Sequence, residues 1–201
     1  LPICATQPAA EPEETGFSKK NPFQAPLLSN VNLNAKGSSK DTRHIALSLA
    51  GSGLTYEVGD ALGVFVQNCP DVVDAVIAAH RFDPQSDASL PDGSKATLRE
   101  ALLKHYEVRQ LYGKTPEANV TCTAFIESLR KLQPRLYSIA SSLKAHPEEV
   151  HLCVAAVRYS DDGIEHKGVA STFLADRLAR KAPAVSSGSY TPEPGTGPQG
   201  L

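Results

Sequence analysis

The sequence predicts a mainly β fold that is interrupted by a helical insertion. Residues 43–49 and 151–159 alternate between two faces with the period of two that is typical of strands. Between these runs, apolar residues recur at helical spacing, and Thr97 and Glu100 form a T-x-x-E capping box. This order favours a β fold with a small helical subdomain inserted at about 69–132.

The predicted strands differ in how they are buried. Residues 43–49 place Ile45, Leu47 and Leu49 on one face, which indicates a half-buried strand. Residues 61–66 are a short apolar run that indicates a buried strand. Residues 151–159 are largely apolar on both faces, so we expect a central strand there.

Four helices are predicted, and two of them have clear start signals. Asn68 is the expected N-cap of the first, with Pro70 in its first turn and an apolar stripe formed by Val72, Val73, Val76 and Ile77. The capping box begins the second, and a third is expected over 124–132. The fourth starts at or just after Gly168, in the stretch GVASTFLADRLAR.

Both ends of the chain lack the apolar periodicity of folded elements. Residues 1–20 are rich in Pro, Glu, Ala and Lys and predict a linker or disordered tail. Residues 181–201 are rich in Pro, Gly and Ser and predict a second disordered tail, which leaves 21–180 as the folded domain. The chain starts with Leu and has no methionine, as expected for a piece of a longer polypeptide.

Composition excludes several classes of function. The 201 residues carry a formal net charge of −2, so no basic excess points to nucleic acid. No stretch approaches the roughly 20 apolar residues of a membrane helix. The four cysteines stand singly, without a CxxC pair or a histidine at ligand spacing: Cys4, Cys69, Cys122 and Cys153. We therefore expect free thiols, no metal, no membrane and a cytoplasmic protein.

Chemistry is concentrated between Arg135 and the last predicted helix. Arginine binds phosphate through its planar fork, and the ring of Tyr137 offers a flat apolar face. Gly168 has no Cβ, so a ligand can approach the backbone N–H groups of the helix that follows. Each residue also has an ordinary structural explanation, as a surface arginine, a core tyrosine or a helix start. Together, in one strand-to-helix unit, they favour a dinucleotide-type cofactor.

Three segments, RLYSIASS, HLCVAAVRY and KGVASTFL, occur in this order and at a specific spacing. In this combination, the sequence resembles the FAD-binding module of the diflavin NADPH reductases, in the ferredoxin-NADP reductase superfamily. The sulfite or nitrate reductase flavoprotein branch is the most similar in pattern, and residues 21–68 also resemble the segment that opens this module in cytochrome reductases of the same design. The resemblance covers about 21–178. It implies an antiparallel Greek-key FAD-binding barrel that carries the helical insertion.

The resemblance also implies roles for individual residues. Arg135 would contact the FAD pyrophosphate, Tyr137 would stack on the isoalloxazine, and Ser138 would lie near the flavin N5 as the catalytic candidate. Tyr159 would pack against the adenine end. The flavin ring would be lined by 153–155, and the pyrophosphate would be held by 168–171. The complete implied set is Arg135, Leu136, Tyr137, Ser138, Cys153, Val154, Ala155, Tyr159, Gly168, Val169, Ala170 and Ser171.

The sequence departs from the family pattern in three places. The helical insertion is considerably longer in the family, and neither the flavodoxin-like FMN module nor the NADPH-binding module is present. Those two modules, or a reductase partner subunit, are the implied partners. The implied activity passes electrons from NADPH through FAD to FMN or a metal centre. The alternative is a truncated remnant without useful FAD binding or catalysis.

A hydrolase is a weaker interpretation, with Ser141 or Ser142 as a nucleophile served by His146 or His151. No G-x-S-x-G motif supports it, and hydroxyl pairs in turns usually bond to the backbone. The remaining candidates have simple explanations: Cys153 as a small buried apolar residue, and Asp161–Asp162 before Gly163 as a turn. Solvated side chains are expected for His44, His80 and His105.

Overall fold

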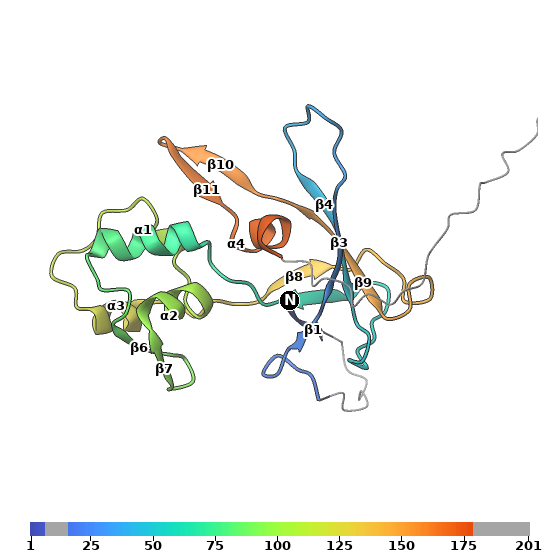
Figure 1. Ribbon diagram of the computed structural model, residues 1–201, viewed down its shortest axis with the longest axis horizontal. Coiled ribbons are helices and arrows are strands. Elements are labelled where there is room, and N and C mark those ends of the chain that lie inside the picture. Colours follow the sequence, from blue (N-terminus) through green and yellow to red (C-terminus); the bar gives the residue numbers. More distant parts are fainter. Residues whose placement is uncertain (7–15, 179–201) are drawn as a thin grey trace, which may run out of the picture.

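The computed structural model of the protein describes residues 1–6 and 16–178 (Figure 1). The strands contain more residues than the helices, and a group of short helices lies to one side of the sheets. The mainly β fold with a helical part is thus confirmed. Two separate hydrophobic cores correspond to these two parts, one between the sheets and one among the helices.

The first sheet has the strand order β2-β1-β5-β8, and every pair in it is antiparallel. Its β5 strand pairs with β1 on one side and with β8 on the other, and apolar residues of β1 and β5 meet in the core. The strands of this sheet are β1 (Pro2–Thr6), β2 (Phe23–Gln24), β5 (Ala61–Val64) and β8 (Arg135–Ser138).

The second sheet has the order β3-β4-β9, and it is also antiparallel. Its strands are β3 (Leu27–Asn32), β4 (Thr42–Ser48) and β9 (Glu149–Ala155). Ile45 of β4 pairs with Leu152 of β9, and both are fully buried. A single antiparallel bridge between Ile139 and Leu152 connects this sheet to the end of β8.

A helical segment closes one side of the core that the two sheets share. It consists of α4 (Val169–Thr172) and the π-helical turn η2 (Phe173–Arg177). Phe173 and Leu174 are buried against the sheet residues, as the sequence predicts. A hairpin of β10 (Arg158–Asp161) and β11 (Ile164–Lys167) precedes this segment and projects from the body (Figure 1).

The helical subdomain is formed by the residues that are predicted to be an insertion. Buried apolar residues from three helices and from the β6–β7 hairpin form its core, with Val72, Val73, Val76, Ile77, Leu98 and Leu102 among them. Its elements are α1 (Pro70–His80), β6 (Asp87–Ser89), β7 (Lys95–Thr97), α2 (Leu98–Lys104), η1 (Arg109–Leu111) and α3 (Cys122–Ser128).

The expected tail over 1–20 is wrong for β1. Ile3 pairs with Val64 of β5 and is fully buried, so this short strand is part of the sheet. The segment LPICAT is too short to show periodicity by itself, and only the partner strand makes it identifiable. The predicted tail at 181–201 lies outside the described residues.

The long strand predicted over 151–159 is also wrong in extent and position. β9 ends at Ala155, and the chain then starts the β10–β11 hairpin. β9 is last in the strand order of its sheet, apart from the bridge at Leu152, so it is not a central strand. The small side chains of Cys153 and Ala155, which gave the segment its two apolar faces, are exposed.

Helix starts follow the sequence signals only in part. Thr97 caps α2 as predicted, since its hydroxyl accepts the N–H of Glu100 at 3.2 Å. Asn68 is not the cap of α1, because Cys69 holds that position without a side-chain cap bond. The buried amide of Asn68 instead donates to the carbonyls of Leu102 (2.7 Å) and Tyr106 (2.6 Å). It thereby fixes the start of α1 to the end of α2.

Candidate functional site

Strand β8 carries the RLYS segment, and its two faces differ in exposure. Arg135 and Tyr137 are half-buried on one face, whereas Leu136 and Ser138 are exposed on the other. Tyr137 packs against the core between the sheets, and this burial raises the pKa of its hydroxyl above the ordinary value. The hydroxyl is therefore neutral at physiological pH, and the rest of the ring remains partly accessible.

Strand β9 presents a second exposed row of residues close to the end of β8. Cys153 and Ala155 are exposed, while Val154 is only 2% exposed and points into the core. The Ile139–Leu152 bridge brings the two strands together, and the antiparallel register continued from it places Ser138 across from Cys153. The structure thus brings together two of the three predicted FAD-binding segments.

The start of α4 is held by close packing. Gly168 is the N-cap, and its carbonyl accepts both the N–H and the hydroxyl of Thr172. A Cβ at position 168 would lie 2.6 Å from Oγ of Ser171, which itself accepts the N–H of Val157 at 3.0 Å. The first-turn N–H groups of 169–171 have no acceptor within the helix. Glycine is therefore required here by packing, and the backbone N–H groups are what this turn offers to a ligand.

Arg135 is already paired in this structure. Its guanidinium donates to the carboxylate of Glu107 at 2.5 Å, and this residue comes from the segment that follows α2. The pair links β8 to the helical subdomain. Sequence analysis identified Arg135 but missed Glu107, because 28 residues separate them and no motif joins them.

The β10–β11 hairpin holds Tyr159 against an aromatic partner. Tyr159 and His166 stack with their ring centroids 5.0 Å apart and an interplanar angle of 19°. They are directly opposite in the hairpin register. His166 was missed, although the tight turn at Asp162 and Gly163, both with positive φ, is the signal that fixes this register. The prediction that Asp161–Asp162 leads into a turn is confirmed.

A half-buried arginine joins the helical segment to the chain between β5 and α1. The guanidinium of Arg177 donates to the carbonyls of Asn68 (2.6 Å), Gln67 (2.9 Å) and Val169 (3.2 Å). It also lies over the ring of Phe173, 5.0 Å from the centroid. Burial lowers the pKa of this guanidinium from its usual value. Sequence analysis missed Arg177, since an arginine at the end of an amphipathic helix has no distinctive pattern.

The structure does not support Ser141 or Ser142 as the nucleophile of a hydrolase. Oγ of Ser141 accepts the backbone N–H of His151 at 2.9 Å and shares a 2.6 Å hydrogen bond with the hydroxyl of Tyr56. Within residues 1–6 and 16–178, no serine hydroxyl is hydrogen-bonded to a histidine ring nitrogen. Cys153 is exposed, so its explanation as a small buried apolar residue is wrong.

The site combines features that are typical of a dinucleotide-binding domain: two exposed strand segments, an arginine and a helix start with free backbone N–H groups. The chain belongs to the FAD-binding domain family, whose sequence model matches residues 15–91 and 89–173. FAD is the cofactor of this family, which confirms the resemblance and the cofactor inferred from the sequence.

Known relatives define the type of FAD-binding domain more closely. The chain is 40% identical to the sulfite reductase [NADPH] flavoprotein alpha-component of Bacillus subtilis, over 87% of the chain and 36% of that protein. It is 37% identical to the protein of that name from Neisseria meningitidis (87% and 35%) and 35% identical to that from Mannheimia succiniciproducens (81% and 33%). The chain therefore spans about a third of the length of these relatives.

The Bacillus protein has residues within the aligned region that this chain lacks. The alignment runs over 219 positions, more than the 201 residues of the whole chain, although it covers only 87% of them. The relative therefore carries residues in this region that have no counterpart here. A separate finding concerns membranes: among the described residues, no helix is both long and apolar enough to cross a bilayer.

Proposed function

We propose that the chain binds one FAD along the exposed ends of β8 and β9, with the pyrophosphate at the start of α4. The observation that carries this proposal is a set of exposed apolar and aromatic side chains around that path: Leu136 (62% exposed), Val157 (48%) and Tyr159 (46%). Large apolar residues exposed together commonly mark a ligand-binding surface. These three come from β8, from the start of the hairpin and from β10.

The flavin ring is assigned to the residues around the Ile139–Leu152 bridge. Tyr137 stacks on the isoalloxazine with the accessible part of its ring, and the hydroxyl of Ser138 hydrogen-bonds near N5. Cys153 and Ala155 contact the ring through exposed side chains, whereas Val154 contributes only its backbone because its side chain is in the core.

The pyrophosphate is assigned to Arg135 and to the backbone of 168–171. This role requires Arg135 to share its guanidinium with, or release it from, Glu107. Val169, Ala170 and Ser171 offer N–H groups, because the side chains of Ala170 and Ser171 are buried. The exposed Tyr159, which stacks on His166, packs against the adenine.

We also propose that the two antiparallel sheets form the Greek-key barrel of the ferredoxin reductase type. The shared hydrophobic core and the Ile139–Leu152 bridge between β8 and β9 support this arrangement. In this description the helical subdomain is an insertion between β5 and β8, because its elements lie between them in the chain.

The proposed activity is electron transfer within an NADPH-dependent flavoprotein reductase. Bound FAD can accept a hydride from a nicotinamide and release its two electrons singly. The names of the relatives support NADPH as the source and sulfite reduction as the process. The partners are then an FMN module, an NADPH-binding module or a reductase subunit. The free Cys69, Cys122 and Cys153 fit a reducing compartment such as the cytoplasm.

A truncated remnant that does not retain FAD is the alternative, and the shortened insertion favours it. The test is to saturate the purified chain with FAD, remove excess flavin by desalting, reduce the protein with dithionite under argon, remove the remaining dithionite by anaerobic desalting and add a c-type cytochrome. Flavin that stays bound, is reduced and is reoxidised as the cytochrome is reduced supports the module. Flavin that is lost entirely on desalting from a folded protein supports the remnant.

A further inference from the structure

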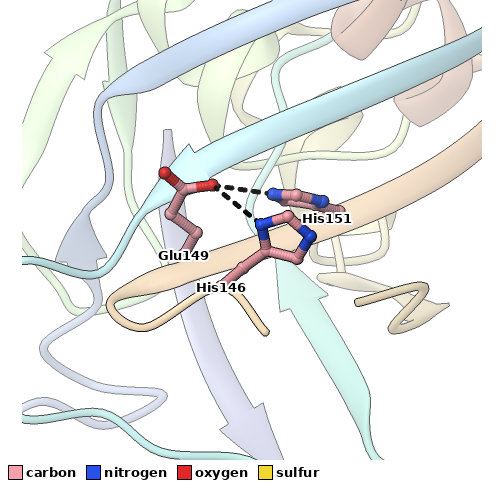
Figure 2. Close-up of side chains that lie close together, drawn as sticks. All are labelled: His146, Glu149 and His151. Carbon is pink, nitrogen blue, oxygen red and sulfur yellow. Dashed lines mark hydrogen bonds and ion pairs between the residues drawn. The ribbon is translucent and has the colours of Figure 1, made fainter. Parts of the chain in front are cut away.

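Two histidines and a glutamate converge at the turn that leads into β9, and none of them is among the residues assigned to FAD (Figure 2). Nε2 of His151 lies 2.9 Å from Oε2 of Glu149, and Nδ1 of His146 lies 4.0 Å from the same oxygen. One nitrogen or oxygen atom from each of the three residues lies within 4.8 Å of the others. Imidazole and carboxylate together are a common ligand set for zinc and related divalent metals.

Hydrogen bonds hold the backbone of the turn that carries these residues. The N–H of Glu149 donates to the carbonyl of His146, and Glu148 between them has a positive φ of 58°. The hydroxyl of Tyr56 donates to the carbonyl of Glu149 at 3.0 Å, and Ser141 accepts the N–H of His151. The backbone of both Glu149 and His151 is therefore fixed before any ion binds, which lowers the entropic cost of assembling a site.

The surroundings of the cluster also suit a metal. The side chain of His151 is 10% exposed, so it lies largely away from solvent, while that of His146 is 49% exposed and can rotate towards the cluster. His44 of β4 packs edge to face on His151, with ring centroids 4.9 Å apart, and the rings of His146 and His151 lie 4.5 Å apart. Three imidazoles and one carboxylate thus share one small region at the end of a sheet.

We propose that His146, Glu149 and His151 form a binding site for a divalent transition metal, with zinc as the best match. Ligand atoms in a tetrahedral zinc site are about 3.3 Å apart, given bonds of about 2.0–2.1 Å. The pair formed by Glu149 and His151 is already within that spacing, and rotation of the exposed His146 side chain supplies the third ligand. Water takes the fourth position.

The site would hold the turn before β9 against this strand, and its ligands are not among the residues assigned to FAD. His151 lies two residues before Cys153 on the same strand, so the metal would brace the strand that carries the assigned flavin contacts. The other explanation is a hydrogen-bonded ion pair between Glu149 and His151 without metal affinity. The two explanations differ in a measurable way, because only a metal site needs His146.

The test is titration of the purified chain, without FAD, with Zn²⁺ by calorimetry and with Co²⁺ by visible absorption. We expect one ion bound per chain, a rise in melting temperature with Zn²⁺, and no comparable effect of Mg²⁺, which prefers oxygen ligands. His146→Ala and Glu149→Gln should each weaken Zn²⁺ binding by about tenfold or more. His105→Ala, in the helical subdomain, is the control and should bind Zn²⁺ as tightly as the parent chain.

Two results would overturn the proposal. One is the absence of Zn²⁺ binding at micromolar concentrations by folded protein. The other is binding that is the same in the parent chain, His146→Ala and Glu149→Gln, which would place the ion on other groups such as the free cysteines. Because His146 is exposed on a turn, His146→Ala should fold normally, and its melting temperature without metal checks this.

Discussion

The guanidinium of Arg135 and the carboxylate of Glu107 form an ion pair with a 2.5 Å contact between β8 and the helical subdomain. Both side chains are partly exposed, at 41% and 23%, so solvent screens the pair and its contribution to stability is below about 1 kcal/mol. In the proposed FAD complex, the carboxylate would compete with an FAD phosphate for the same donor. The helical subdomain would thereby act on the proposed cofactor site.

Removing this competitor should strengthen FAD binding. Glu107→Gln leaves the guanidinium free and removes a negative charge beside the pyrophosphate, so we expect FAD affinity to rise by about fivefold. Arg135→Ala should lower affinity by about tenfold or more. Equilibrium titration of both variants checks this. A loss of affinity in Glu107→Gln would show that the ion pair positions Arg135 rather than competing for it.

Position 168 should tolerate no side chain. Gly168→Ala places a Cβ 2.6 Å from Oγ of Ser171 and 3.0 Å from Cβ of Val157, so the start of α4 must shift. We expect a destabilisation of about 1–3 kcal/mol in urea unfolding, together with weaker FAD binding. Gly163→Ala is the comparison that separates packing from backbone strain, because its Cβ would meet nothing within 4 Å but its φ is +77°. Wild-type stability in Gly168→Ala would contradict this explanation.

Arg177 should be a major contributor to stability although it is not among the residues assigned to FAD. Arg177→Ala leaves the carbonyls of Gln67, Asn68 and Val169 without this donor and removes the cation above Phe173. The expected loss is about 2–4 kcal/mol in the free energy of unfolding. Arg99→Ala, which breaks an exposed pair with Asp74, is the matched control and should change stability by less than about 1 kcal/mol. Equal effects of the two would refute a special role for Arg177.

Asp41 should contribute to the acid sensitivity of the fold. Hydrogen bonding from Arg43, and then from Arg158, holds the pKa of its carboxyl below the ordinary value of 3.8. Because the folded-state pKa is the lower one, this stabilisation is fully present above pH 3.8 and is lost as pH falls through the folded-state pKa. Asp41→Asn should therefore reduce stability at pH 7 and flatten its fall below pH 4. Parallel stability–pH curves for the two proteins would contradict this.

The sequence predicts well those strands and helices whose signals lie within one short stretch of residues. Period-two alternation located β4, helical spacing located α1, and the Thr97 box located the start of α2, because each signal is complete within one element. β1 was missed because its burial depends on pairing with β5, almost 60 residues later in the chain. Cys153 was misjudged because a small apolar side chain does not show which face of a strand is covered.

In the candidate site, too, the sequence identified some residues and only the structure identified others. The family motifs gave Arg135, Tyr137 and the helix start, while Glu107, His166 and Arg177 came only from the structure. Each of these three acts through a partner that another element brings close. The cluster of His146, Glu149 and His151 was likewise hidden, since its spacing matches no familiar metal motif and only the turn brings the ligands together.

Stacking of FAD on Tyr137 is central to the proposed cofactor site. The most direct measurement is calorimetric titration of the chain, Tyr137→Phe and Tyr137→Ala with FAD, with circular dichroism to confirm that each variant is folded. We expect one FAD per chain, similar affinity in Tyr137→Phe, and a loss of about tenfold or more in Tyr137→Ala, since aromatic stacking contributes about 1–3 kcal/mol. Equal FAD affinity in all three folded proteins would contradict the assignment of the flavin to β8.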